Sequence, residues 1–210
     1  RGRKDNGNIA YDTCTYSRKE IVRLAKKGFE LAMKRSKKLC CVDKANVLES
    51  SRLWRETVQA MEKDYPEVEV SYEFVDAVAM RLVQWPNSYD VLITENLFGD
   101  ILTDEASVIS GSMGLMPSAS VGTENALYEP IHGSFPQATG LGIANPLATI
   151  LSAAMLFEMS FGLIEEGAEI RRVVDLSLAE GVVTEDLKEG SVKANSTSEV
   201  GDYLVKQILG

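Results

Sequence analysis

The chain has 210 residues, of which 45% are hydrophobic and 25% are charged. A chain of this length and composition can bury a sizeable core and is globular rather than disordered. Its formal net charge of -9 argues against a nucleic-acid partner, because phosphate backbones are held by surplus lysine and arginine. The basic run from Lys34 to Lys38 does not reverse this, since we expect it to close a helix, whose C-terminal end favours cations.

The cysteines and the longest apolar stretch bear on the cellular compartment. Cys14, Cys40 and Cys41 form neither a disulfide framework nor a zinc-ligand pattern, which favours a reducing cytoplasm. The stretch from Pro146 to Leu163 is interrupted by polar residues and is short for a bilayer span, so we expect a buried helix and no membrane partner. Because the chain opens at Arg1 without a methionine, we expect it to continue upstream in a longer protein.

Predicted helices and strands alternate along the first half of the chain. Ser17 and Glu20 form a capping box that predicts the start of a helix with Ile21, Leu24, Ala25, Gly28 and Ala32 on its inner face. The expected elements that follow are a strand at 39–42, a helix at 50–64, a strand at 68–74, a helix at 77–83, a strand at 90–94 and a helix at 98–109. This alternation is typical of an α/β fold.

The second half begins with a segment of different composition. Residues 111–145 are rich in Gly, Ser and Pro and show little periodicity, which predicts a functional loop region. Three helices are expected after it, at 146–161, 168–179 and 197–209. Their predicted inward residues are Ile170, Val173 and Val174 in the second helix, and Val200, Leu204 and Ile208 in the third.

Two carboxylates in the first half have the spacing of neighbours on a helix. Asp100 and Asp104 stand at positions i and i+4, so a helix places both on one face. A hard divalent cation such as Mg²⁺ or Mn²⁺ prefers oxygen ligands and relieves the repulsion between such a pair. The alternative is an ordinary solvated helix face.

Two further charged residues stand where predicted strands end. Asp76 follows the strand at 68–74, and Lys44 follows the strand at 39–42. Ligands in α/β folds bind near the carboxyl ends of strands, and a partly desolvated lysine near a metal can act as a base. The alternatives are a helix N-cap for Asp76 and a surface position for Lys44.

The segment around the chain's one histidine offers polar backbone rather than a nucleophile. His132 is followed by Gly133, Ser134, Gly140 and Gly142, whose exposed amides can hold phosphate oxygens. The segment does not have the G-x-G-x-x-G pattern after a strand. A cluster of surface turns is the alternative interpretation.

Several segments, taken in order, resemble a known family. They are 42–49, 74–77, 96–107, 111–120, and 129–134 continued by 143–146. This series resembles the β-decarboxylating dehydrogenases, the family of isocitrate and isopropylmalate dehydrogenases. Residues 44–48 followed by 51–55 are similar to the isopropylmalate branch, whereas the isocitrate branch continues differently after the lysine.

The resemblance implies two α/β domains without a Rossmann fold. Residues 1–111 would form the domain for substrate, metal and dimerisation, and residues 112–210 the C-terminal part of the dinucleotide-binding domain. The implied reaction is oxidative decarboxylation of 3-isopropylmalate with NAD, a step of leucine biosynthesis. Related enzymes acting on isocitrate, homoisocitrate or tartrate are alternatives, as are a non-catalytic subunit of the same fold and an unrelated metal-binding domain. The family's substrate arginines and proton-donating tyrosine lie upstream of the matching part.

The resemblance also implies roles for individual residues. Asp76, Asp100 and Asp104 would hold Mg²⁺ or Mn²⁺ together with a small-molecule substrate, and Lys44 would act on the substrate hydroxyl. Asn46 matches a position near the nicotinamide and the substrate. In this family the equivalents of Lys44 and Asp76 reach into the neighbouring subunit's site, which implies a homodimer with shared active sites.

A second group of residues matches the family's segment for the adenosine end of the cofactor. The matching positions are Glu129, His132, Gly133, Ser134, Gln137 and Asn145. Gln137 stands where members that prefer NAD often carry an aspartate, and a neutral amide does not repel the 2′-phosphate of NADP. The expected cofactor remains NAD.

Overall fold

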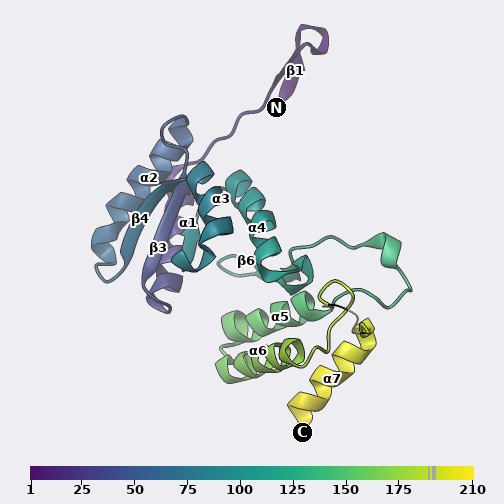
Figure 1. Ribbon diagram of the computed structural model, residues 1–210. Coiled ribbons are helices and arrows are strands. Elements are labelled where there is room, and N and C mark those ends of the chain that lie inside the picture. Colours follow the sequence, from purple (N-terminus) through teal and green to yellow (C-terminus); the bar gives the residue numbers. More distant parts are fainter. Residues whose placement is uncertain (189, 191–192) are drawn as a thin grey trace. The chain divides into compact units, whose positions relative to one another are not determined.

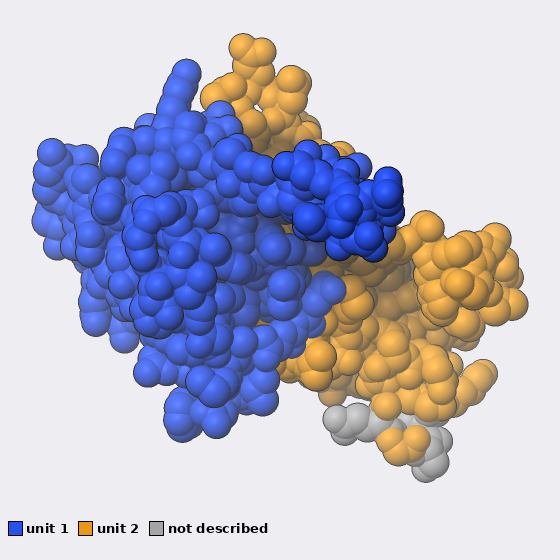
Figure 2. All heavy atoms as spheres, turned by 90° about the horizontal axis from the view of Figure 1, so that it is seen from above, with its two compact units in different colours: residues 1–105 blue, residues 106–210 orange. Residues whose placement is uncertain are grey.

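The computed structural model describes residues 1–188, 190 and 193–210. They form two compact units, residues 1–105 and residues 106–210, which Figure 2 colours separately. The division falls within one helix, α4 (Asn96–Ser110), six residues before the expected boundary at residue 111.

The first unit contains the predicted alternation of strands and helices (Figure 1). An antiparallel hairpin of β1 (Gly2–Lys4) and β2 (Ile9–Tyr11) precedes it. The elements that follow are α1 (Arg18–Met33), β3 (Lys38–Asp43), α2 (Glu49–Met61), β4 (Glu69–Phe74), α3 (Val75–Gln84), β5 (Val91–Ile93) and α4. The α/β class expected from the sequence is therefore confirmed for this unit.

The sheet of the first unit is parallel and covered by helices on both faces. Its strand order is β4-β3-β5, and β3 pairs with both neighbours. Residues of α1 and α2, among them Phe29 and Val58, pack with Leu39 and Cys41 on one face. Val78 and Leu82 of α3 and Leu102 of α4 pack with the alternate residues of β3 on the other. Burial on both faces explains why β3 reads as a continuous apolar run.

The first helix shows how local sequence sets up this packing. The Ser17 hydroxyl oxygen accepts a hydrogen bond from the Glu20 amide, and the Glu20 carboxylate accepts one from the Ser17 amide, as the capping box predicts. A Cβ built on Gly28 would lie 2.3 Å from Cγ2 of Ile93, so only glycine permits this approach of helix to sheet. The expectation for Leu24 was wrong, since it is 44% exposed while Phe29 takes the buried position.

The basic run begins at Lys34, the C-cap of α1, as expected, but two of its other charges are paired with carboxylates. The helix ends at Met33, and no basic residue lies in its last turn. Arg35 forms an ion pair with Asp90 at 2.5 Å, and Lys37 forms one with Glu67 at 2.5 Å. Arg35 and Lys37 are therefore paired with loop carboxylates in addition to lying just beyond the C-terminal end of the helix.

The second unit packs helices around a small apolar core. Its elements are β6 (Pro117–Val121), β7 (Ala126–Pro130), α5 (Leu147–Leu156) with a π-helical continuation (Phe157–Phe161), α6 (Ile164–Ala179) and α7 (Thr197–Leu209). Leu147, Val173, Val174, Val200 and Leu204 form the core, as predicted for the last four. Ile208 was expected inside but is 44% exposed.

The segment 111–145 is not the irregular loop that the sequence suggested. It contains an antiparallel hairpin in which β6 pairs with β7 from Pro117↔Pro130 to Val121↔Ala126. The small residues of β6 give only a weak alternation of apolar and polar side chains, which is why the periodicity did not reveal it. Among the described residues, no helix has the length and apolar character needed to cross a membrane.

Candidate active site

Lys44 and Asp76 meet at the carboxyl edge of the parallel sheet. The register of β3 with β4 ends at Asp43↔Phe74, so Lys44 and the first turn of α3 emerge side by side. Lys44 Nζ donates to Asp76 Oδ1, and the two form an ion pair. The N-cap of α3 is Phe74, so the capping role considered for Asp76 does not apply. Lys44 is only 25% exposed in its side chain, so it is not an ordinary surface lysine.

The ion pair has electrostatic consequences for the carboxylate. The hydrogen bond from Lys44 lowers the pKa of Asp76 below its usual value. Asp76 is therefore an anionic oxygen donor at neutral pH, even though 64% of its side chain is exposed. Lys44 Nζ also lies 5.6 Å from the centre of the Phe74 ring, which adds a cation–π contact from the end of β4.

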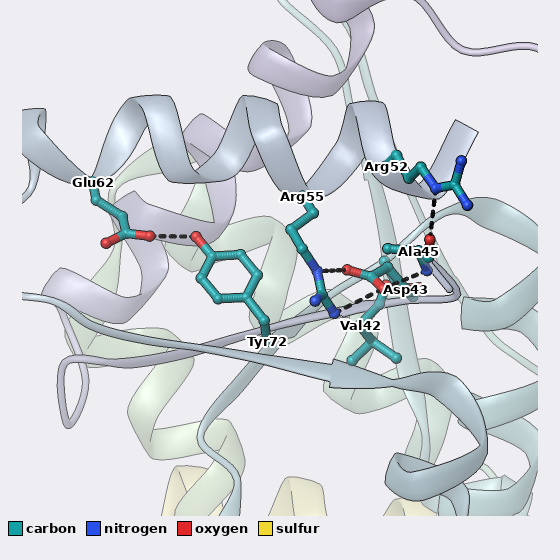
Figure 3. Close-up of polar contacts among 8 residues, drawn as sticks. Val42, Asp43, Ala45, Arg52, Arg55, Glu62 and Tyr72 are labelled. Carbon is teal, nitrogen blue, oxygen red and sulfur yellow. Dashed lines mark hydrogen bonds and ion pairs between the residues drawn. The ribbon is translucent and has the colours of Figure 1, made fainter. Parts of the chain in front are cut away.

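A buried carboxylate directly before Lys44 fixes the turn in which the lysine lies (Figure 3). Asp43 is 1% exposed and makes two bonds with Arg55, from Nε at 2.8 Å and from Nη2 at 3.0 Å. The same carboxylate accepts the backbone amide of Ala45 at 2.9 Å. Asp43 thus holds the backbone on both sides of Lys44.

Arg55 reaches this turn across a layer of aromatic rings. Its guanidinium carbon lies 5.2 Å from the Phe74 ring centre and 5.6 Å from that of Tyr72. On the outer side of the turn, Arg52 Nε donates to the Ala45 carbonyl at 2.9 Å. Asp43 and Arg55 were not predicted from the sequence. The signal that could have found Asp43 is a charged residue at the end of an apolar strand, but its pairing with Arg55 is a tertiary contact.

Asn46 lies at the tip of the same turn. The amides of Val47 and Leu48 donate to the Lys44 carbonyl at 2.9 Å each, which closes a tight turn around Asn46. Asn46 is exposed. The turn that holds Lys44 therefore presents the Asn46 amide to solvent, at the same edge of the sheet.

Asp100 and Asp104 lie on α4, as their spacing predicted. Both are exposed, and a helix places such a pair on one face. Among the residues described, no group of three or more His, Cys, Asp or Glu side chains is placed to hold a metal ion. A single chain therefore does not bring Asp76, Asp100 and Asp104 together.

The start of α4 is held by a buried glutamate that the sequence analysis did not single out. Glu95 accepts the amides of Leu97 at 3.1 Å and Phe98 at 2.9 Å, which caps the helix. Tyr16 donates its hydroxyl to Glu95 at 2.8 Å and accepts the Asn96 amide at 3.1 Å. Burial and the bond to Glu95 raise the pKa of Tyr16 to about 12, although the Asn96 amide opposes the shift, so the phenol stays neutral.

The residues expected at the cofactor lie in the second unit, between β7 and α5. Glu129 is on β7, His132, Gly133 and Ser134 follow in a turn, Gln137 is in the short 3-10 helix Pro136–Ala138, and Asn145 immediately precedes the N-cap of α5. All except His132 and Asn145 are exposed. The segment is therefore one stretch of accessible backbone and short side chains.

Two features of this segment leave positions for a group from outside the chain. His132 Nδ1 lies 2.9 Å from the Gly133 carbonyl, while Nε2 is buried and has no hydrogen-bond partner within the described part of the chain. A Cβ built on Gly133 would meet nothing within 4 Å, and the Gly133 backbone is not left-handed. Neither packing nor conformation within the chain therefore requires a glycine there.

Comparison with known proteins places this geometry in a family. The sequence model of the Isocitrate/isopropylmalate dehydrogenase family matches residues 1–204. A 3-isopropylmalate dehydrogenase of Bacteroides fragilis is 58% identical over 95% of this chain and 56% of its own length. One from Pseudomonas savastanoi is 55% identical over 96% of this chain and 56% of its own length. The chain thus spans about half the length of the curated relatives it matches.

Solved structures give the same result for the fold. An isocitrate dehydrogenase from Methylococcus capsulatus superposes with a TM-score of 0.91 at 35% identity, covering 97% of this chain and 60% of that one. A β-decarboxylating dehydrogenase from Thermococcus kodakarensis gives 0.86 at 36% identity, covering 98% of this chain and 60% of that one. The chain belongs to the isocitrate/isopropylmalate dehydrogenase family.

Proposed function

We propose that the whole protein oxidises and decarboxylates 3-isopropylmalate to 2-oxoisocaproate and carbon dioxide, a step of leucine biosynthesis, with NAD and a divalent metal. The observation that carries the proposal is the Lys44–Asp76 pair at the carboxyl edge of the sheet. The chain's identity to curated 3-isopropylmalate dehydrogenases, 50 to 58% for those compared, supports the choice of substrate.

The residues of the first unit fit a hard divalent cation. Asp76, Asp100 and Asp104 offer carboxylate oxygens, the donors that Mg²⁺ and Mn²⁺ prefer. Because one chain does not bring the three together, we assign Asp76 and Lys44 to one subunit of each site, and Asp100 and Asp104 to the other subunit of a homodimer. When bound, such an ion stabilises negative charge on the substrate oxygens.

Lys44 is the proposed catalytic residue of this chain. Its ammonium is partly shielded from solvent and shares a proton-bearing bond with Asp76. To act as a base at this position, Lys44 would first release one ammonium proton to solvent, and the neutral amine would then accept the proton of the substrate hydroxyl. The bonds of Asp43 keep the turn in place, so the lysine does not have to be ordered when the substrate binds.

The second unit fits the adenosine end of a dinucleotide. The buried Nε2 of His132 can accept an N–H from an adenine, and the open backbone at Gly133 lets a flat ring approach closely. Glu129, Ser134, Gln137 and Asn145 complete the proposed cofactor residues. We propose NAD as the cofactor. Gln137 carries no charge that would repel a 2′-phosphate, so NADP belongs in the test.

We also propose a cytoplasmic location. Cys14, Cys40 and Cys41 are free thiols, and Cys14 is exposed, which suits a reducing compartment. Burial raises the pKa of Cys40 to about 11, so this thiol stays protonated.

The test is an assay of the full-length gene product. NADH formation is followed with 3-isopropylmalate or isocitrate, with NAD or NADP, and with Mn²⁺ in the presence or absence of a chelator. We expect reduction of NAD by 3-isopropylmalate that the chelator abolishes. Asp104→Ala should reduce turnover at least ~100-fold, because removing one metal ligand weakens both the metal site and the positioning of substrate.

The other outcomes identify the alternatives. Turnover with isocitrate alone would replace the proposed substrate by that of the Methylococcus capsulatus relative. No turnover with any pair, together with Asp104→Ala that leaves a partner complex intact, would establish a non-catalytic subunit. Asp64→Asn, which changes an exposed carboxylate beyond α2, is the matched control and should retain wild-type turnover.

A further inference from the structure

The side chain of Asn145 is already engaged within the chain. Its Nδ2 donates to Asp186 Oδ2 at 2.9 Å, and its Oδ1 accepts the backbone amide of Leu147 at 2.9 Å, at the start of α5. Asn145 ends the segment that we assign to the cofactor. One N–H and one lone pair of the amide are used in this way, so the side chain holds the segment in addition to the cofactor contact that we propose for it.

Asp186 is the centre of the contacts that hold Asn145. Its Oδ2 also accepts from the Ser112 hydroxyl, and its Oδ1 accepts from Thr184 Oγ1 at 2.5 Å. These donors come from three separate stretches, namely the turn after α4, the end of the cofactor segment and the loop after α6. A single carboxylate therefore joins three loops of the second unit.

The carboxylate is suited to this role because it is ionised. Partial desolvation opposes ionisation, but the hydrogen bonds from Ser112, Thr184 and Asn145 outweigh it and lower the pKa of Asp186. The ionised carboxylate carries a full negative charge, and the three neutral donors all bind to it. Bonds of this kind are about twice as strong as those between neutral groups.

Packing around Asn145 depends on the same contacts. A Cβ built on Gly114 would lie 2.6 Å from Cβ of Asn145, so a glycine is needed for the two backbones to approach. The Gly114 amide donates to Ser112 Oγ at 2.9 Å, and that hydroxyl in turn donates to Asp186. The segment Gly111–Ser120, whose residues had no individual role assigned from the sequence, thus packs against Asn145 through Gly114 and binds Asp186 through Ser112.

The helix α7 holds the neighbouring residues of the segment. The Thr197 amide donates to the Gly142 carbonyl at 2.8 Å, and Thr197 Oγ1 donates to the Ala144 carbonyl at 2.6 Å. Gly142 has a φ of +65°, a conformation that glycine adopts without strain. The last four residues of the segment are thus fixed by α7 on one side and by Asp186 on the other.

We propose that Asp186 is a positioning residue for the dinucleotide: through Asn145 and Ser112 it holds the end of the cofactor segment in its binding shape. The proposal rests on the proposed function only in taking residues 129–145 as the cofactor site. It does not depend on which 2-hydroxy diacid is oxidised.

The test is NADH affinity of the full-length protein, measured directly by NADH fluorescence. We expect Asp186→Ala to weaken NADH binding about tenfold or more, because the segment must then be ordered on binding. Asp186→Asn should have a smaller effect, since it keeps the shape but replaces one acceptor oxygen with a donor. In turnover, KM for NAD should rise about as much as the dissociation constant, with kcat at saturating NAD changed less than ~3-fold.

A double-variant cycle separates positioning from a general loss of stability. If Asp186 acts through Asn145, the pair Asn145→Ala and Asp186→Ala should weaken NADH binding hardly more than the worse single change. Asp202→Asn, an exposed carboxylate on α7, is the matched control and should bind as wild type. Melting curves confirm that each variant is folded, and Asp186→Asn carries the test if Asp186→Ala does not fold.

The result that would overturn this proposal differs from the result that would overturn the proposed function. Folded Asp186→Ala and Asp186→Asn that bind NADH within twofold of the control would refute the positioning role while leaving the enzyme assignment intact. Wild-type protein that binds NADH but does not oxidise 3-isopropylmalate would refute the proposed substrate alone. A wild-type protein that binds neither NADH nor NADPH would overturn both.

Discussion

At the scale of single residues, Asp43 shows how a buried side chain can hold the proposed catalytic lysine in place without contacting the substrate itself. A carboxylate that is 1% exposed is costly unless it is paired and hydrogen-bonded. Asp43 meets both conditions, through the two bonds from Arg55 and the amide of Ala45. The charge is thus retained inside the unit because it fixes the backbone on either side of Lys44.

Asp43→Asn should therefore affect both stability and turnover. The change leaves Arg55 without its counter-charge, and breaking a buried pair from one side costs about 3 kcal/mol of folding free energy. Because Lys44 is next in sequence, kcat should fall even under conditions where the variant is fully folded. Urea unfolding and steady-state assays of the full-length protein measure the two effects.

Asp64→Asn is the control for this prediction, since it removes an exposed carboxylate from the same unit. Arg55→Lys keeps the charge but loses the two-pronged geometry, so its stability and its kcat should lie between those of wild type and Asp43→Asn. An Asp43→Asn variant with wild-type kcat would show that the turn holds Lys44 without this carboxylate.

Residue identity made part of the site predictable. Charge and position made Lys44, Asp76, Asp100 and Asp104 candidates, each with an ordinary structural alternative, and the resemblance to the family is what gave them roles. The roles of Asp43 and Asp186 were not predicted, because each acts through partners that lie in other elements: Arg55 on α2 for Asp43, and Ser112 and Asn145 in two separate loops for Asp186. Such networks depend on tertiary contacts, which the pattern of a single segment does not contain.

At the scale of elements, the start of α4 illustrates how the helix that carries the proposed metal ligands Asp100 and Asp104 is anchored. Glu95 satisfies two amides of the first turn, and Tyr16 satisfies a third while donating to Glu95. Tyr16 comes from the stretch before α1, some eighty residues away in sequence. The orientation of Asp100 and Asp104 therefore depends on a contact between segments distant in the chain.

Tyr16→Phe tests this anchoring through its pH dependence. The folded-state pKa of Tyr16 is raised to about 12, above the ordinary value of 10.0, so the folded protein binds this proton more tightly. The contribution of Tyr16 to stability is then complete below pH ~10 and is lost as the pH rises towards ~12. We expect urea unfolding to show a smaller loss of stability over that window in Tyr16→Phe than in wild type.

At neutral pH the same variant should be about 1 kcal/mol less stable, because the Asn96 amide and Glu95 lose a partner. Tyr11→Phe, in which an exposed tyrosine is changed, is the matched control. Equal alkaline slopes for wild type and Tyr16→Phe would show that another group governs that transition.

Elements with a strong periodicity of apolar residues were predicted well, and elements with a weak periodicity were missed. The capping box at Ser17 predicted the start of α1, and the apolar periodicity of residues 197–209 predicted α7, which begins at Thr197. The β6–β7 hairpin was hidden because its strands are only five residues each, β6 consists mostly of small residues, and prolines stand at the start of β6 and the end of β7. Pairing with a neighbouring strand, rather than a sequence pattern, is what makes these residues extended.

At the scale of the whole molecule, the arrangement of carboxylates bears on the oligomeric state. Lys44 and Asp76 are joined at one edge of the sheet, while Asp100 and Asp104 lie on α4 and form no three-carboxylate group with Asp76 among the described residues of one chain. A homodimer with shared sites accounts for this separation, because each site would draw its two halves from different subunits.

Mixing two inactive variants tests this arrangement directly. Lys44→Ala and Asp100→Ala should each be nearly inert as homodimers, because every site then lacks either the lysine or a metal ligand. In a mixed dimer with shared sites, one site collects both changes and the other collects none. Equal amounts exchanged at random make half of the dimers mixed, each with one intact site, so activity should return to about a quarter of wild type.

If all four residues served one site within a chain, every site in the mixture would carry a defect and no activity would return. Mixing Lys44→Ala with Asp76→Ala is the matched control. Both residues come from the same half of a site, so this mixture should stay inert under either arrangement.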